Sequence, residues 1–452
     1  MYFNSFEFYL FFIFVFLSIR IFNYPAQILL LSSVSFYAFA GFLDLTLIAT
    51  VIAANWVIIV TCRQHPIRLV LAVVVNIGVL GFFKYRDFFF PSDIEQAVSF
   101  TESVLPLGIS FYTFQIISYH VDSFRGDSAE TKTPTLFGLF VSFFPQLIAG
   151  PIVRSNQLIP QLQRLIGGHR RRLWLPGYGL SLCLLGLTKK IIFADSLAPL
   201  VDELFLEQPP NAPSAWLGAW LFTFQIYFDF SGYSDIAVGC AYLLGIRLPV
   251  NFRSPYISRS PREFWQRWHI TLSNWIRDYV YIPLGGSRGG LVRQAIILVF
   301  VMSIAGLWHG AGWNFIIWGA AWGGCIAIAR IFSRLLSIPA IVTWPLLMVV
   351  VVSTWVLFRA PDIMFAIDYL TVMFGVRQPA LTKPWVWDFW ILIGCASLML
   401  LHWGEASLHS ARTLRWIKRW DGPLIWGLYV GLCLWLVVMP AYTINPFIYF
   451  RF

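Results

Sequence analysis

The sequence predicts an all-α polytopic membrane protein, on the evidence of its composition and the spacing of its apolar runs. Of the 452 residues, 58% are hydrophobic and 12% are charged, whereas soluble domains carry about 25% charged residues. Apolar runs recur along the whole chain at about the 17 to 25 residues that a helix needs to cross a bilayer. A soluble globular domain is therefore excluded, and we expect about eleven membrane-spanning helices in a single domain over residues 1–452.

The apolar runs give the expected elements in chain order. The first run starts near Phe6 without a basic segment before it or a small-residue cleavage site after it, which favours a membrane helix over a signal peptide. The candidate spans are residues 6–22, 26–43, 45–62, 67–83, 104–120, 135–152, 176–200, 214–246, 293–311, 313–333, 339–358, 385–402 and 424–441.

Loop charges set the expected topology. The short basic loop from Arg63 to Arg68 should face the cytoplasm, which places the N-terminus outside. Simple alternation then puts the basic loop His169–Arg172 on the outer side, against the same rule. A re-entrant segment within 135–152, broken by Pro145 and Pro151, resolves this conflict.

The net charge of +10 lies in such short loops, which favours lipid headgroups over nucleic acid as the partner. The six cysteines stand singly, mostly within apolar runs. They predict packing residues, without a zinc site or a disulfide framework.

His309 is the first candidate catalytic residue. It stands in the step Trp308-His309-Gly310, between apolar stretches on both sides. A titratable imidazole at membrane depth is costly, so it should line a cavity and have a function. The alternative is a core histidine that is hydrogen-bonded to a carbonyl.

The segment from Ser260 to Tyr279 predicts an interfacial helix. Ser260 and Glu263 form a capping box, and Pro261 takes the first helical position. On one continuous helix, His269 shares the apolar face with Trp268 and points toward protein, while the arginines face the interface. If His269 and His309 converge, proton transfer is the expected chemistry, and metal ligation is the alternative.

Four charged residues fall at membrane depth. Asp229 and Asp235 flank Ser231-Gly232, and such carboxylates are expected to satisfy broken backbone, to pair with an arginine such as Arg247 or Arg253, or to act in the mechanism. Lys189 and Lys190 end an apolar run, and we expect them to snorkel to headgroups rather than to meet phosphates.

Several strings together carry a resemblance to a known family. They are PLGISFYTFQIISYHVD, FFPQLIAGPIVR, GLTKKIIFAD, FDFSGYSDIAVG, NFRSPY, REFWQRWHITLSNWIRDYVYIPLGG, AGLWHGAGWNFIIWG and the terminal NPFIYFRF. On these motifs the chain resembles the membrane-bound O-acyltransferase (MBOAT) family, specifically its alginate O-acetyltransferase-like branch. The FWxRWH and WHG elements in this order are the most specific part. His120 departs from the pattern, where the family has an apolar residue, and a packed histidine is the expected explanation.

The resemblance implies a ring of helices, with re-entrant and interfacial helices, around a central tunnel that an acyl donor enters from the cytoplasm. It implies acetyl transfer from acetyl-CoA across a bacterial inner membrane to a secreted polysaccharide, through periplasmic esterase-like partners. No bound cofactor or metal is expected. His309 matches the family's catalytic histidine, and His269 matches its second motif position.

In this account His309 is the general base and His269 is a second catalytic or orienting group. Oxyanion donors are sought in Trp308, Asn314 and the backbone amides of Gly310 to Gly312. The candidate tunnel residues are Trp268, Asp229, Asp235 and Lys189, and the candidate phosphate ligands are Arg259, Arg262, Arg267 and Arg277.

Other functions stay open from the sequence. Within the same chemistry, the alternatives are peptidoglycan O-acetylation and the more remote D-alanylation of teichoic acid. Outside the enzymes, a transporter of lipid or glycan is the alternative, and its flux would survive substitution of His309.

Overall fold

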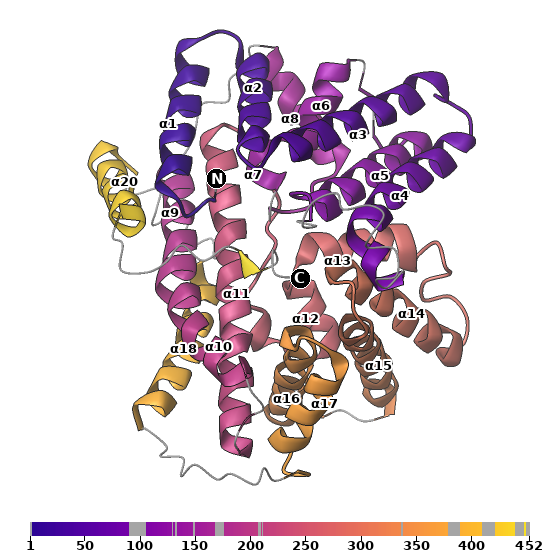
Figure 1. Cartoon of the computed structure of the whole chain (residues 1–452), viewed down its shortest axis with the longest axis vertical. Coiled ribbons are helices and arrows are strands. Elements are labelled where there is room, and N and C mark those ends of the chain that lie inside the picture. Colours follow the sequence, from indigo (N-terminus) through magenta and orange to yellow (C-terminus); the bar gives the residue numbers. More distant parts are fainter. Residues whose placement is uncertain are drawn as a thin grey trace, which may run out of the picture. The chain divides into compact units, whose positions relative to one another are not determined.

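A computed structural model describes residues 2–89, 105–128, 130–131, 133–147, 150–167, 176–206, 209, 211–335, 338–377, 389–408, 421–438 and 447–448. The secondary-structure elements in these ranges are helices, as the composition predicts (Figure 1). The chain divides into two compact units, each built from separate stretches of sequence. Unit 1 comprises Met1–Leu187, Tyr233–Val250 and Lys418–Pro440, and unit 2 comprises Thr188–Gly232, Asn251–Ile417 and Ala441–Phe452. The single domain expected over residues 1–452 stays a prediction.

Unit 1 is built mainly from the N-terminal helices. Within it α2 packs against α1, α3 and α6, α4 packs against α5, and α9 packs against α20. Its helices are α1 (Phe6–Ile21), α2 (Pro25–Ala38), α3 (Phe42–Thr61), α4 (Ile67–Phe89), α5 (Ile109–Arg125), α6 (Pro134–Ser142), α7 (Phe144–Leu147), α8 (Ser155–Ile166), α9 (Pro176–Leu187) and α20 (Pro423–Val438).

Unit 2 contains both candidate histidines, His269 and His309. Its elements are η1 (Thr188–Ala194), α10 (Asp195–Leu206), α11 (Ala212–Leu243, whose last turns belong to unit 1), η2 (Pro255–Ile257), α12 (Pro261–Arg267), α13 (Ile270–Ile276), η3 (Arg277–Tyr281), α14 (Leu291–His309), α15 (Trp313–Leu335), α16 (Ala340–Arg359), α17 (Ile363–Met373) and α18 (Phe389–Leu408). The helix α14 packs along α15, and α16 packs against both α15 and α17 (Figure 1).

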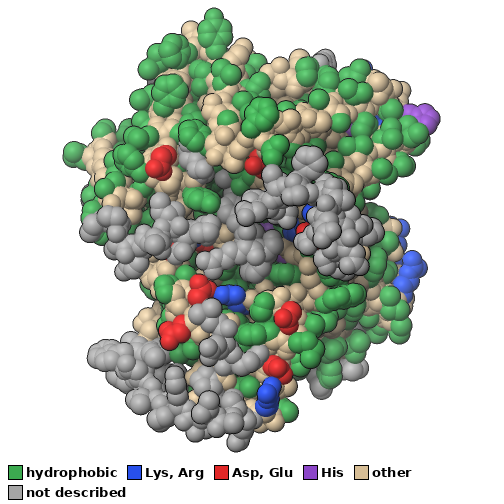
Figure 2. All heavy atoms as spheres, viewed as in Figure 1, with side chains coloured by type: hydrophobic (Ala, Val, Ile, Leu, Met, Phe, Trp, Pro, Cys, Tyr) green, Lys and Arg blue, Asp and Glu red, His purple; other side chains and the backbone are tan. Residues whose placement is uncertain are grey.

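Five of the described helices, α3, α4, α14, α15 and α16, are long and apolar enough to cross a membrane. Shorter apolar helices lie at α2, α17 and α20. Hydrophobic side chains cover much of the described surface in the view of Figure 2, as a lipid-facing protein requires. The count of about eleven spans and their ring stay predictions, and the basic loop His169–Arg172 lies outside the described residues.

The run expected to be re-entrant is broken, at Phe143 and so two residues before the predicted breaker Pro145. The helix α6 has 9 residues, a length of about 14 Å, which is too short to cross the hydrocarbon core. It ends at Ser142, and the single turn α7 that follows contains Pro145. The sidedness of this segment stays a prediction.

A buried polar network joins α3, α4 and α5 in unit 1. Arg68, which the sequence places in an exposed basic loop, is fully buried, and it pairs with Glu130. Its Nε donates to His120 Nδ1 at 3.1 Å, and His120 Nε2 then donates to Asn55 Oδ1 at 3.1 Å. Asn55 and Asn76 exchange hydrogen bonds of 3.1 and 2.8 Å between two candidate membrane helices. His120 is therefore a packed, hydrogen-bonded histidine, as expected.

The hairpin of α14 and α15 is packed at backbone distance because glycines face the partner helix. A Cβ at Gly306 would collide with the carbonyl of Phe315, and a Cβ at Gly319 would collide with the carbonyl of Met302. Neither obstacle can move without shifting a helix. This close approach fixes the end of α14, where His309 lies.

Replacing Gly319 with alanine is expected to destabilise the protein by about 3 kcal/mol or more, because the added methyl group overpacks two helix backbones. Thermal unfolding of the detergent-purified protein measures this loss. The matched control is Gly324→Ala in the same helix, where a Cβ meets nothing within 4 Å. Equal melting temperatures for the two variants would contradict the close packing.

Candidate active site

His309 is the last residue of α14, and it is 2% exposed. The helix ends there because Gly310 takes an extended conformation, and α15 begins three residues later at Trp313. Aromatic rings surround the imidazole: ring centroids of Trp308, Trp318 and Phe358 lie 4.9, 5.3 and 5.3 Å away. His309 therefore sits in an enclosed aromatic setting, as expected of an imidazole placed in an apolar run.

His269 lies at a break in the helix that the sequence predicts as continuous. The helix α12 ends at Arg267 and α13 begins at Ile270, so the expectation of one amphipathic helix from Ser260 to Tyr279 is wrong. His269 takes the left-handed conformation with φ 40°, which is unfavourable for a residue with a side chain by about 1–2 kcal/mol. Such outliers persist where the surrounding structure imposes them, often at functional sites.

The Ser260 cap at the start of α12 is confirmed: Ser260 Oγ accepts a hydrogen bond from the backbone of Glu263 at 3.1 Å, while the Glu263 carboxylate accepts from the backbone of Arg259 at 2.8 Å and not from that of Ser260. The expectation that His269 points toward protein is confirmed as well, since its side chain is fully buried. Burial lowers the pKa of His269 from 6.5 to about 3, so the imidazole is neutral at physiological pH.

The two histidines converge, although 40 residues separate them in the chain. Their ring centroids lie 6.5 Å apart, and the ring of Trp308 contacts both imidazoles. Because a ring nitrogen lies roughly 1 Å from its centroid, the rings are too far apart for a direct hydrogen bond, which needs about 3 Å between nitrogens. The spacing suits a single oxygen atom that contacts both rings.

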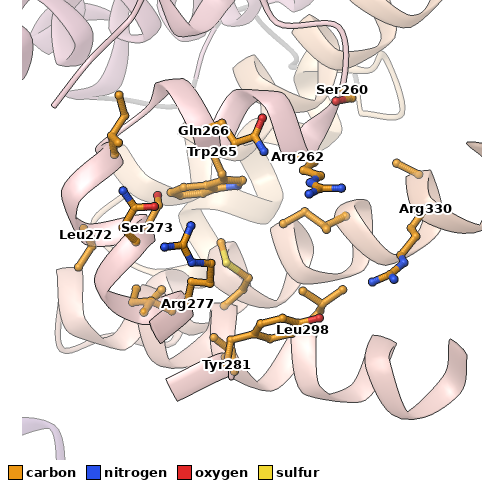
Figure 3. A pocket seen from close by; sticks show the side chains of 18 of the residues that line it. Ser260, Arg262, Trp265, Gln266, Leu272, Ser273, Arg277, Tyr281, Leu298 and Arg330 are labelled. Carbon is orange, nitrogen blue, oxygen red and sulfur yellow. The ribbon is translucent and has the colours of Figure 1, made fainter. Parts of the chain in front are cut away.

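A cavity of about 690 Å³ reaches His309 within unit 2. Near His309 its lining is apolar, with Val301, Met302 and Ala305 from α14. Farther from His309 the lining stays largely apolar but includes three arginines: Figure 3 shows Arg262 from α12, Arg277 from η3 and Arg330 from α15 around one cavity. The other residues that line the cavity include Ser260, Trp265, Gln266, Leu272, Ser273, Asn274, Tyr281, Ser287 and Ser333.

Only part of the basic set that the sequence offers reaches this cavity. Arg262 and Arg277 line it, whereas Arg259 and Arg267 are not among its lining residues. The side chain of Arg267 pairs with Glu263 at 3.0 Å and donates to the carbonyl of Arg253 at 3.1 Å. Arg267 therefore stabilises α12 and its contact with the segment at Arg253.

Asp229 and Lys190 form a buried charge cluster with Asp195. Lys190 Nζ lies 2.8 Å from Asp195 Oδ1 and 2.5 Å from Asp229 Oδ1, and all three side chains are buried. The second oxygen of Asp229 accepts from the backbone of Ile448 at 2.7 Å, which ties the C-terminal segment to α11. Asp229 is therefore paired, as one alternative held, but its partner is Lys190 and not Arg247 or Arg253.

Lys189 forms a second buried pair, with Glu405 of α18. Glu405 also accepts from Tyr227 at 2.6 Å and lies 3.6 Å from His402 Nδ1. Both lysines belong to the π-helical turn η1, and both are buried, so the expectation that they snorkel to headgroups is wrong. The ion pairs with buried carboxylates offset the desolvation cost of burying these two lysines.

The other candidates lie beside the cavity or away from it. Trp268 is fully buried and packs on Trp355, with ring centroids 4.9 Å apart, while Trp265 lines the cavity. Asn314 Nδ2 donates to the carbonyls of Leu357 and Ala360 at 3.3 and 3.0 Å, which commits its amide hydrogens to tying α15 to α16. Asp235 belongs to unit 1 and is half-buried.

Two residues of this site escaped the sequence-based prediction. Arg330 ends the apolar run AAWGGCIAIAR, and a basic residue at the end of a span normally indicates headgroups. Asn251 stands in the motif NFRSPY, and its side chain contacts His269 across 18 residues. A buried asparagine gives no periodic signal that a single sequence can reveal.

Comparison with known proteins places this site in a family. The model of "MBOAT, membrane-bound O-acyltransferase family" matches residues 133–367. A probable alginate O-acetylase AlgI of Azotobacter vinelandii is 41% identical over 371 residues, which cover 78% of this chain and 73% of that protein. The peptidoglycan O-acetyltransferase of Helicobacter pylori is 35% identical over 402 residues, 79% of this chain and 75% of that protein. A teichoic acid D-alanyltransferase of Streptococcus thermophilus is 31% identical over 239 residues, 50% and 57% of the two chains.

The region that the family model matches contains both histidines, Asn251 and the whole lining of the cavity. The apolar helices described above agree with a multi-pass membrane protein. The chain is thus an O-acyltransferase that belongs to the membrane-bound O-acyltransferase family.

Proposed function

We propose that the protein takes an acetyl group from acetyl-CoA and passes it to a hydroxyl acceptor, for the O-acetylation of a secreted polysaccharide. The observation that carries this proposal is the cavity that joins His309 to arginines from three different elements. Similarity to alginate O-acetylases over most of the chain supports acetyl as the acyl group and a polysaccharide as its destination.

The cavity suits a donor with an anionic head and a small acyl group. Guanidinium groups of Arg262, Arg277 and Arg330 attract the phosphates of acetyl-CoA, because planar forked donors match phosphate oxygens. The apolar lining and the aromatic rings near His309 suit a thioester and a two-carbon acyl group. The donor supplies the activated carbonyl itself, so the chemistry needs no further cofactor.

In the proposed reaction His309 acts as general base. It takes the proton of the attacking hydroxyl, the oxygen forms a bond to the acetyl carbonyl carbon, and the carbon–sulfur bond breaks. The proton on His309 then passes to the departing thiolate, which restores the enzyme and releases CoA. His269, 6.5 Å from His309 between ring centroids, acts as the second catalytic or orienting group.

The route and the partners extend this proposal. The donor enters from the cytoplasm of a bacterial cell, the acetyl group crosses the inner membrane, and periplasmic esterase-like proteins pass it to the polysaccharide. The relative from Helicobacter pylori makes peptidoglycan the alternative acceptor. Separate extraction of labelled exopolysaccharide and labelled peptidoglycan after acetyl transfer distinguishes the two.

Neutralising the donor-binding arginines tests the cavity. Arg262→Gln and Arg330→Gln are each expected to raise the KM for acetyl-CoA roughly tenfold, about 1.4 kcal/mol of binding, with little change in kcat. Initial rates of radiolabelled acetyl transfer in membranes give both constants. The matched control is Arg377→Gln, an exposed arginine of the same unit that pairs with Asp368 outside the cavity. Unchanged KM values in both cavity variants would rule out this donor site.

A further inference from the structure

Asn251 is held rigidly beside the break between α12 and α13. Its carbonyl oxygen accepts from the backbone of Ile270 at 2.9 Å, and the nearby Arg253 donates its backbone N–H to the carbonyl of Arg267 at 2.9 Å. The Asn251 side chain is 2% exposed. The segment therefore flanks His269 on both sides of the break, and the asparagine amide has little freedom to turn.

The contacts of Asn251 Oδ1 identify it as an acceptor. It accepts from the backbone N–H of Thr271 at 3.2 Å and from the Thr271 hydroxyl at 2.9 Å. A backbone N–H can only donate, so the atom that it meets is the amide oxygen and not the amide nitrogen. The amide orientation thus follows from the network.

The same oxygen lies 3.1 Å from His269 Nδ1. Because Oδ1 can only accept, His269 must carry its proton on Nδ1 to make this hydrogen bond. A neutral imidazole with its proton on Nδ1 has its lone pair on Nε2. In the neutral state His269 is therefore able to accept a hydrogen bond at Nε2 and unable to donate one there.

We propose that Asn251 is a positioning residue that holds His269 in the Nδ1–H tautomer, so that Nε2 serves as a hydrogen-bond-accepting nitrogen during acyl transfer. The inference rests on the proposed function, since it assigns His269 a part in that reaction. It excludes His269 as a donor to the oxyanion and makes it an orienting group for a hydroxyl placed near both imidazoles.

The surroundings of His269 make this tautomer testable. Among the described residues its ring contacts come from Phe230 at 4.7 Å, Trp308 at 6.1 Å, Phe252 at 6.2 Å and His309 at 6.5 Å. Of these four, His309 is the titratable group. The charge of His309 therefore changes next to His269 as well, whereas Phe230, Trp308 and Phe252 stay neutral at every pH used.

The decisive variant is Asn251→Asp, compared with Asn251→Leu. Aspartate keeps an acceptor for Nδ1–H but adds a negative charge, which favours protonated His269 and removes the lone pair on Nε2 at higher pH than in the wild type. The pKa of His269, followed through its ¹⁵N signals across pH, is expected to rise by about 1–3 pH units, with most acetyl transfer retained at pH 9. Leucine supplies no acceptor, and it is expected to lower the rate at least tenfold at every pH.

Asn76→Asp is the matched control, since Asn76 is a buried asparagine of unit 1 that pairs with Asn55. It should lower the yield of folded protein and leave the pKa of His269 unchanged. A His269 pKa in Asn251→Asp equal to that of the wild type would overturn the positioning role. So would a shift of equal size in Asn76→Asp.

A spectroscopic measurement tests the tautomer without any assay of activity. In protein labelled with ¹⁵N at its seven histidines, the signals lost in His269→Ala belong to His269. We expect a protonated Nδ1 and an unprotonated Nε2 in the wild type, and a mixture of tautomers in Asn251→Leu. A proton on Nε2 in the wild type would refute the inference. If the tautomer is as expected but the folded wild type transfers no acetyl group, the proposed function fails separately.

Discussion

Polysaccharide from cells that carry His309→Ala is expected to lose its O-acetyl esters, with a rate of acetyl transfer roughly 10²–10⁴-fold below wild type. The general base is removed, and the aromatic setting around position 309 offers no replacement: Trp308, Trp318 and Phe358 have no group that takes a proton near neutral pH. His269→Ala should cost less, because it removes an orienting group and leaves the base in place. Ester content of the purified polysaccharide measures both losses.

His65→Ala is the control for this comparison, since His65 is exposed in the loop between α3 and α4 of unit 1. It should leave the ester content unchanged. All variants need to be compared at equal amounts of folded protein, because His309 is buried and an alanine there leaves a small cavity. A wild-type ester content with folded His309→Ala would contradict the assignment of the base.

Lys190→Met is expected to cost about 3–5 kcal/mol of stability and to leave little folded protein. The substitution removes the cation that Asp195 and Asp229 share in the described ion pairs, so two buried carboxylates lose their common charged partner. Loss of the cluster also loosens the hold of Asp229 on Ile448, whose neighbour Phe447 packs on Phe230 beside His269. Thermal unfolding in detergent and the yield of folded protein give the measurement.

Two further variants distinguish a structural role of the Lys190 cluster from a role in acetyl transfer. Asp229→Asn keeps the pair between Lys190 and Asp195 and still accepts from Ile448, so it should cost only about 1–2 kcal/mol. Added to Lys190→Met, the same change should recover part of the lost stability, because it removes one uncompensated charge. If Lys190→Met folds like the wild type and loses acetyl transfer, the cluster acts in the reaction instead.

Much of the helical organisation follows from the sequence. Runs such as 293–311 and 339–358 became α14 and α16 within two residues at each end, because a long apolar stretch between loop residues has few other solutions in lipid. The Ser260 cap fixed the start of α12 in the same way. Local patterns of this kind involve residues that are close in the chain, so a single sequence is enough to detect them.

The details of the site depend on contacts that no local pattern encodes. The break at Trp268 and His269 arises because the backbones of Asn251 and Arg253 compete for Ile270 and Arg267, far from them in the chain. The helical spacing of apolar residues alone predicts that the helix continues through these two residues. From the sequence, the lysines of η1 are expected to snorkel. In the structure Lys189 instead pairs with Glu405, which lies 216 residues away in the chain. The apolar setting of His309, the helical pattern around His269 and then the motif resemblance identified the two histidines, whereas Arg330 and Asn251 needed the three-dimensional structure.

The central claim is that this chain moves acetyl groups from acetyl-CoA by means of the histidine pair at the end of the cavity. The most direct measurement follows radiolabelled acetyl from acetyl-CoA into glycan, in membranes that carry the chain with its neighbouring gene products. Wild type is compared with a double variant that combines His309→Ala and His269→Ala at matched expression. The account predicts labelled glycan with the wild type and only background label with the double variant. Full labelling with both histidines removed would contradict it and would favour a transporter.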